Sequence, residues 1–276
     1  QAAADLVYSS VLPDQSFLVG NSSPYNFIDL DGSNEYIDCG DGSGLSLSGS
    51  DAFSISAWIN PDVVNAAQVV VAFGSDTGSS PEGKRTAMFI SSSAVATLAF
   101  WGNDVTGGSI SASAWTHFVV TFAGGNRTSA NSAIYINGVA QSLSGGTASA
   151  LDLSDMDFVH IGADHTPDQE FNGKIGQSAI WNKALSSTEV SAIYTLGRHG
   201  NLLNKYSDNL VGYWAMSSLD ASTGLSDVGN GTIYDRSGQS NHGTATNTEA
   251  ADLASSPNAT PNGYAKQDTN RSTDVK

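Results

Sequence analysis

The segment of residues 171–194 constrains the fold of this chain more than any other, because a strand pattern is followed there by one short helix. Apolar side chains recur at alternate positions in the first half of the segment: Phe171, Ile175, Ala179 and Trp181. A period of two is typical of a strand with one face on the core. The rest of the chain has β patterns, so a lone helix after a strand narrows the choice of folds.

The expected helix carries its own start and stop signals. Ser186 and Glu189 have the spacing of a capping box, in which each side chain binds the other residue's backbone N–H. Gly197 is placed to end the helix. Its apolar face consists of Val190, Ile193 and Tyr194.

Short strand patterns separated by turn residues fill the chain before this segment. The expected strands cover residues 27–30, 36–39, 52–59, 68–73, 86–90, 94–101, 114–122, 133–136, 158–162 and 173–181. The first two are joined by D-G-S-N and predict a hairpin, and Asn137-Gly138 predicts another. The apolar run at 68–73 predicts a strand covered on both faces. Such a series is typical of a β-sandwich or jelly roll.

Residues 52–59 alternate most regularly. The pattern places Phe53, Ile55, Ala57 and Ile59 on one face, with Ser54, Ser56 and Trp58 on the other. Cys39, the single cysteine, excludes a disulfide within the chain and is expected to be a small buried strand residue.

Several motifs, in their order, resemble the laminin-G-like (concanavalin A-like) jelly-roll domains. They are L-D-G-S-N-E-Y-I-D, F-S-I-S-A-W-I-N-P, W-T-H-F-V-V-T-F, I-Y-I-N-G-V, F-N-G-K-I and W-N-K-A-L-S-S-T-E-V. The resemblance covers residues 27–198 and implies an all-β fold. We therefore expect a two-sheet antiparallel jelly-roll sandwich, concanavalin A-like, with one short helix after the last core strand.

The ends of the chain do not follow the order of that family. We expect an N-terminal arm at 1–26, the jelly roll at 27–198, a C-terminal extension at 199–248 and a polar arm at 249–276. The extension holds N-L-V-G-Y-W and Y-D-R-S-G-Q-S-N-H-G, motifs that commonly come first in the resembled family. It can start a second copy, fold back on the same sandwich, or add to a neighbouring subunit, and folding back is favoured. The residues expected to serve in assembly are Tyr213, Trp214, Tyr234, Asp235 and His242.

Charge limits the possible partners. The formal net charge is −16, from 27 acidic and 11 basic residues. Binding to nucleic acid or to an anionic membrane needs clustered Lys and Arg. We therefore expect neither of them as a partner. The sequence also has no apolar run long enough to span a bilayer.

Catalytic patterns are missing from the sequence. A retaining glycosidase needs two carboxylates about 5–5.5 Å apart over one sugar, and in this architecture they alternate along a strand. Residues 168–170 offer at most one such pair. A lyase needs a Tyr/His pair with Arg or Gln; His117 and Tyr135 lie on expected strands, but Arg is scarce. We therefore expect no enzyme activity.

Calcium is the one cofactor that the sequence suggests. Ca²⁺ binds six to eight oxygen atoms, and Asp-rich loops supply them. The candidate ligands are Asp29, Asp31, Asp38, Asp164 and Asp168. Each of them can instead be a turn former. The family strand that commonly reads G-x-I-D-E-V has Gly176-Gln177 in place of its acidic pair, so the family's metal-linked acids are missing there.

Glycan binding needs exposed aromatic rings beside amides and carboxylates. Trp101 ends a strand and enters a polar loop, so Trp101, Asn103 and Asp104 are the candidate glycan-binding residues. The other tryptophans lie inside strand patterns and are expected in the core: Trp58, Trp115, Trp181 and Trp214.

Two functions follow from these observations. The whole chain resembles laminin-G-like proteins of tailed marine phages, which implies a capsid decoration or attachment protein that assembles with other subunits on the virion surface. The alternative is a secreted, lectin-like carbohydrate-binding module, with Ca²⁺ as a possible requirement. The expected location is accordingly the virion surface or the extracellular space.

Overall fold

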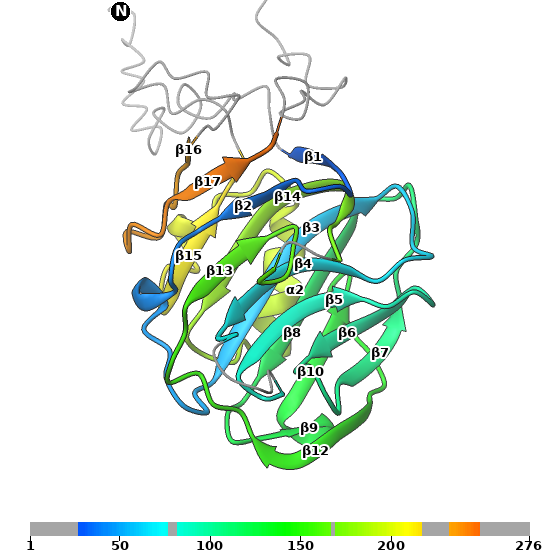
Figure 1. Ribbon diagram of the computed structural model, residues 1–276, viewed down its shortest axis with the longest axis vertical. Helices are drawn as coiled ribbons and strands as arrows, with labels where there is room; N and C mark the ends of the chain where they lie inside the picture. The colour runs from blue at the N-terminus through cyan, green and yellow to red at the C-terminus, as the bar shows by residue number, and fades with distance from the viewer. Residues whose placement is uncertain (1–26, 77–81, 167–168, 217–231, 249–276) are drawn as a thin grey trace, which may run out of the picture.

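The computed structural model describes residues 27–76, 82–166, 169–216 and 232–248 (Figure 1). The expected arms at 1–26 and 249–276 lie outside the described residues, as does Asp168. In the described part of the chain, no helix has the length and apolar character needed to cross a membrane.

Two antiparallel sheets pack face to face and confirm the expected all-β sandwich. The smaller sheet has seven strands: β1 (Ile28–Asp31), β14 (Asn172–Trp181), β3 (Phe53–Pro61), β8 (Thr116–Phe122), β10 (Ser132–Ile136) and β11 (Val139–Ala140) in that order, with β15 (Leu210–Trp214) also paired to β14.

The larger sheet has ten strands, which follow one another across the molecule (Figure 1). Their order is β16 (Thr232–Ile233), β17 (Gly243–Thr246), β2 (Tyr36–Asp38), β13 (Phe158–Ile161), β4 (Gln68–Gly74), β5 (Arg85–Ile90), β6 (Val95–Ala99), β7 (Val105–Ser109), β12 (Ser144–Ala150) and β9 (Asn126–Thr128). Short 3-10 helices lie at η1 (Ser43–Leu45), η2 (Ser129–Asn131) and η3 (Leu202–Asn204).

The main core lies between the sheets and follows the predicted alternation in β3. In β14 the prediction of one apolar face is wrong: the register shift between Ile175 and Ser178 leaves Ile175 in the main core and places Ala179 and Trp181 in a separate cluster. Phe53, Ile55, Ala57 and Ile59 of β3 are all in this core, together with β4, β5, β6, β8 and β14 side chains. Cys39 is buried there too, as expected. Burial of so many apolar side chains is the main favourable term in the stability of the fold.

The helix α2 (Ser187–Leu196) covers the outer face of the seven-stranded sheet. Val190 and Ile193 pack with Trp181 and Leu185 in a second core. The capping box is present: Ser186 Oγ accepts from Glu189 N (3.3 Å), and Glu189 Oε2 accepts from Ser186 N (2.8 Å). Tyr194, expected on the apolar face, is 37% exposed and stacks on Trp58.

The expected hairpin of the first two strands is wrong. β1 pairs with β14 in the smaller sheet, whereas β2 pairs with β13 and β17 in the larger one. The four-residue link crosses between the sheets, so Leu30 and Ile37 both reach the main core from opposite sides. A period of two shows which side chains face a core, and it does not show which sheet contributes them.

The predicted series lacks β9, β15, β16 and β17, and also two strands whose sequences are rich in Gly and Ser. These are β7 (V-T-G-G-S) and β12 (S-G-G-T-A-S-A), whose residues have low strand propensity. The expected turn at Asn137-Gly138 is confirmed: both residues have positive φ (51° and 76°), and β10 pairs with β11. This backbone shape suits a two-residue hairpin.

The C-terminal extension joins both sheets of its own chain. β15 lies beside β14, and β17 lies beside β2 (Figure 1). Tyr213 and Trp214 are buried, and the Asp235 carboxylate accepts from Tyr213 N (2.9 Å). The rings of Tyr234 and His242 pack against each other, with their centres 5.2 Å apart. Of the five residues expected to serve in assembly, Tyr213 and Trp214 pair with β14, whereas Tyr234, Asp235 and His242 contact other residues of the extension.

Candidate functional site

The outer face of the ten-stranded sheet has small, buried side chains at its centre, with polar and aromatic side chains around them. Ala72, Ala87 and Ala99 are register partners on β4, β5 and β6, and they lie away from the main core. Phe158 of β13 and the partly buried Trp101 pack against them. Charged side chains gather around this centre, and we call Arg85, Asp76, Asp164, His165 and Trp101 the Arg85 cluster.

Arg85 holds the cluster together. Its guanidinium is 2.7 Å from Asp76 Oδ1 and 3.1 Å from Asp164 Oδ2. The Arg85 side chain is 8% exposed and that of Asp164 2%, whereas Asp76 is 31% exposed. A buried cation needs such partners, because an unpaired charge in the interior is very costly. Asp76 is therefore the carboxylate of this network that solvent and ligands can reach.

Trp101 borders the cluster from the end of β6. The guanidinium carbon of Arg85 lies 4.2 Å from the centre of the Trp101 ring, a cation–π contact that occupies one ring face. Trp101 has a φ of 54°, which turns the chain sharply after the strand. The ring is half-buried, so part of it remains open on this face.

The other two expected glycan residues shape the turn that follows Trp101. Asp104 Oδ1 accepts from Phe100 N (2.7 Å) and Gly102 N (3.4 Å), as a turn former does. Asn103 is exposed, and its Nδ2 donates to Glu82 Oε1 at 3.1 Å. The structure thus places all three residues in one loop, with Trp101 alone in contact with Arg85.

Histidines and aromatic rings extend the face towards β2. Phe158 lies between His165 (ring centres 5.0 Å apart) and His160 (5.2 Å), and Tyr36 lies 4.8 Å from His160. His160 Nδ1 is 2.9 Å from the backbone oxygen of Asp164. A carbonyl oxygen accepts only, so Nδ1 carries the hydrogen. Burial lowers the pKa of His160, which favours this neutral form.

The expected calcium ligands are dispersed. Asp29 pairs with Lys174 at 3.0 Å, and Asp31 accepts from Ser33 N. Asp38 accepts from Gly40 N and lies 3.9 Å from His160 Nε2, while Asp164 pairs with Arg85. Among the described residues, no three His, Cys, Asp or Glu side chains gather as a metal-binding group.

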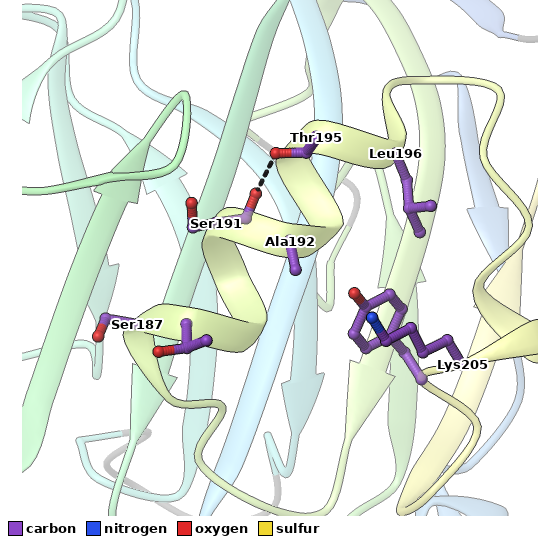
Figure 2. Close-up of a pocket in the computed structure, with 8 residues that line it drawn as sticks. Ser187, Ser191, Ala192, Thr195, Leu196 and Lys205 are labelled. Carbon is purple, nitrogen blue, oxygen red and sulfur yellow. Dashed lines mark hydrogen bonds between the residues drawn. The ribbon is translucent and has the colours of Figure 1, made fainter.

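A hollow of about 640 Å³ lies on the other side of the molecule, between α2 and the segment that begins with η3 (Figure 2). Its walls are Ser187, Thr188, Ser191, Ala192, Thr195, Leu196, Lys205 and Tyr206. Figure 2 shows Leu196 and Lys205 across from each other at one end, and Thr195 bonded to the Ser191 carbonyl within the helix. None of these lining residues is a carboxylic acid or a histidine, and the titratable groups among them are Lys205 and Tyr206.

The tryptophans follow the expectation with one exception. Trp58, Trp181 and Trp214 are buried. Trp115 was expected in the core and is half-buried instead, with Arg198 4.1 Å above its ring. A large ring at the start of a strand can cover the edge of the sandwich without entering it.

The sequence search missed Arg85, Asp76, His160 and His165 as site residues. Arg85 opens an otherwise apolar strand, R-T-A-M-F-I, and that single charge is the signal that points to a special environment. The other three come from β13 or from loops, and they meet Arg85 only through the order β13-β4-β5.

Comparison with known proteins defines the class of the chain. The family model described as the concanavalin A-like lectin/glucanases superfamily, of laminin G type, matches residues 31–191. The chain therefore belongs to this superfamily. A comparison with curated proteins found no match.

Solved structures share the fold. A candidate carbohydrate-binding protein from Bacteroides ovatus superposes with a TM-score of 0.54 at 18% identity, covering 84% of this chain and 62% of that one. The Ruminococcus gnavus IT-sialidase CBM40, solved with α2,3-sialyllactose, gives a TM-score of 0.50 at 15% identity, covering 61% of this chain and 96% of that one. At these identities the likeness shows the fold alone.

Proposed function

We propose that this chain is a non-enzymatic, lectin-like carbohydrate-binding module whose ligand lies on the outer face of the ten-stranded sheet. The observation that carries the proposal is the Arg85 cluster: a half-buried tryptophan beside a reachable carboxylate and imidazole, Asp76 and His165, each 31% exposed. Sugar sites combine apolar ring faces with a few fixed polar groups. The names of the Bacteroides and Ruminococcus proteins support the same function.

The face is longer than one sugar ring. Tyr36 lies on β2 and Trp101 follows β6, four strand steps apart in the sheet order. At about 4.8 Å a step, this distance is about 19 Å. Both rings are half-buried and so keep some open surface. An oligosaccharide that contacts both rings fits this face better than a monosaccharide does.

The polar groups of the cluster that a ligand can reach are Asp76 and His165, each 31% exposed. The Asp76 carboxylate accepts hydrogen bonds from sugar hydroxyls. Arg85 holds that carboxylate in place, and its own Nε is buried out of reach of a ligand. The ligand would therefore meet polar groups whose positions are already fixed.

The same network argues for binding without catalysis. A glycosidase needs one carboxyl group that protonates the leaving oxygen and a second that attacks or activates water. Asp76 and Asp164 are both held by one guanidinium. Neither carboxylate is then free for those roles.

The test is a glycan array followed by calorimetry on the array's best neutral oligosaccharide. We expect Trp101→Ala and Tyr36→Ala each to weaken binding at least tenfold. Tyr194→Ala is the matched control, because Tyr194 is an exposed aromatic residue on the α2 side. Loss of binding in the control alone, or no binding to any glycan by the native protein, would contradict the proposal.

A role on a virion surface is the second candidate, and it is compatible with glycan binding. The order of the motifs and their resemblance to phage laminin-G-like proteins favour it. In the part of the chain that the structure describes, five large apolar side chains are exposed. Four of them surround the C-terminal half of α2, with Val63 elsewhere: Val139, Tyr194, Leu196 and Leu203. Such a patch suits contact with a second copy of this chain.

Assembly is tested by light scattering and by electron microscopy of the purified protein. The proposal expects an oligomer that Leu196→Asp dissociates, whereas Val63→Asp leaves it intact. A native protein that stays monomeric at high concentration would rule out self-assembly. The proposed location is the virion surface or the extracellular space.

A further inference from the structure

We infer that the glycan recognised by the Arg85 cluster is uncharged, and that acidic glycans are rejected. This inference rests on the proposed function, because it names the class of ligand for the same site. It follows from how the charges of the cluster are already paired.

The one arginine of the cluster is more than neutralised. Arg85 contributes one positive charge, and Asp76 and Asp164 contribute two negative ones within 3.1 Å of it. Trp101 covers one side of the guanidinium. A carboxylate or sulfate group on a ligand would therefore find no open guanidinium in the cluster, although arginine is the residue best suited to hold one.

The surroundings add negative charge. Asp157 lies next to Asp76, whose N–H is 3.4 Å from Asp157 Oδ1, and exposed Asp38 lies at the far end of the face. Burial lowers the pKa of His160, which favours its neutral form, and His165 lies 3.1 Å from the Asp76 carboxylate. The next guanidinium, Arg127, is 4% exposed and is paired with Glu82 at 3.3 Å.

Coulomb repulsion then separates the two ligand classes. An anionic group brought within about 4 Å of a net negative cluster meets an unfavourable field and loses its water. A neutral sugar avoids that cost, because its hydroxyls donate to the reachable Asp76 carboxylate. The preference for an uncharged ligand therefore has two sources: the repulsion of anionic groups by the cluster and the hydrogen bonds that it makes with hydroxyls.

The experiment compares pairs of glycans in which one member carries an added anionic group. Lactose and α2,3-sialyllactose form one pair; a neutral galactan and its sulfated form give a second. We expect the neutral member to bind at least tenfold more tightly at low salt, with a smaller difference in high salt because charge is screened.

A charge substitution tests the cause. Asp76→Asn removes one negative charge from the reachable side of Arg85. We therefore expect it to weaken the binding of neutral glycans and to reduce the ratio of the neutral to the acidic affinity at least threefold. Asp208→Asn is the control, because it changes the net charge equally at an exposed position away from the face. Circular dichroism checks that both variants fold.

The outcomes separate the two claims. If the acidic glycan binds more tightly than its neutral partner, or if Asp76→Asn and Asp208→Asn act alike, the inference is wrong while the proposed function stands. If no glycan of either class binds, the proposed function itself fails.

Discussion

The indole N–H of Trp214 donates a 2.8 Å hydrogen bond to the backbone oxygen of Asn241, which ties β15 to the loop before β17. Asn241 is buried and makes two further bonds: its Nδ2 donates to Val211 O at 2.7 Å, and its N donates to Asp235 Oδ2 at 3.0 Å. One asparagine thus connects strands that belong to different sheets.

We expect Asn241→Ala to lower the free energy of unfolding by about 1–3 kcal/mol, because it leaves the buried Val211 carbonyl without its donor. Asn131→Ala is the matched control. It removes a bond of the same type, to Asn126 O at 2.9 Å, at an exposed site where water replaces it. Urea unfolding measures both, and equal losses would argue against a special role for Asn241.

Asp235 is the other anchor of the extension. Its carboxylate accepts from Tyr213 N, Ser237 N and Asn241 N, at 2.9, 2.8 and 3.0 Å. Asp235→Ala strands several buried donors, so we expect a loss of about 2–4 kcal/mol in urea unfolding. The exposed substitution Asp208→Ala should change stability by less than about 0.5 kcal/mol. A loss as small as the control's would show that the extension contributes little to the stability of the sandwich.

Stability should fall as the pH drops below neutrality, because of His117. This ring is buried under α2, with Nε2 2.9 Å from Ser56 Oγ, and burial lowers its pKa from 6.5 to about 3. Between these values the unfolded chain binds a proton that the folded chain does not. Each pH unit below 6.5 therefore costs up to about 1.4 kcal/mol, until the folded pKa is reached.

The double variant Ser56→Ala/His117→Phe should flatten this dependence, because it removes the titrating ring together with its partner. Ser56→Ala alone keeps the ring and serves as control. Unfolding free energies at pH 7, 6 and 5 give the slopes. Identical slopes for the double variant and the control would place the acid sensitivity elsewhere.

The cap of α2 is a local test of the helix signal. Ser186→Ala removes the acceptor of Glu189 N and should cost about 1 kcal/mol. Ser187→Ala, one residue into the helix, should be neutral within about 0.5 kcal/mol, since alanine is a good helix former. Thermal unfolding distinguishes them, and a larger effect at Ser187 would contradict the capping argument.

Much of the fold could be predicted because local patterns determine it. The alternation of β3 and the cap of α2 appear directly in the sequence, and both are confirmed. The sheet assignment of β1 and β2 could not be predicted, because an alternating strand buries the same side chains in either sheet. β7 and β12 were missed because neighbouring strands, more than their own Gly and Ser residues, hold them in place.

The candidate site was harder to predict than the fold. Trp101 could be singled out because it leaves a strand for a polar loop. Arg85 and Asp164 are 79 residues apart in sequence by their numbers, and they meet only because β13, β4 and β5 are neighbours. The ion pairs that set the charge of the site therefore depend on which strands lie side by side, and no local sequence motif predicts them.

The position of β17 has a consequence for the order in which this chain is completed during synthesis. β2 is made early, at Tyr36–Asp38, and one of its edges pairs with β17 at Gly243–Thr246. Until the ribosome has released that late strand, β2 has an open row of backbone donors and acceptors. Such an edge can recruit strands from other nascent chains. The extension therefore covers this edge of β2 only after the jelly roll itself has been made, and a product truncated before β17 would keep the open edge.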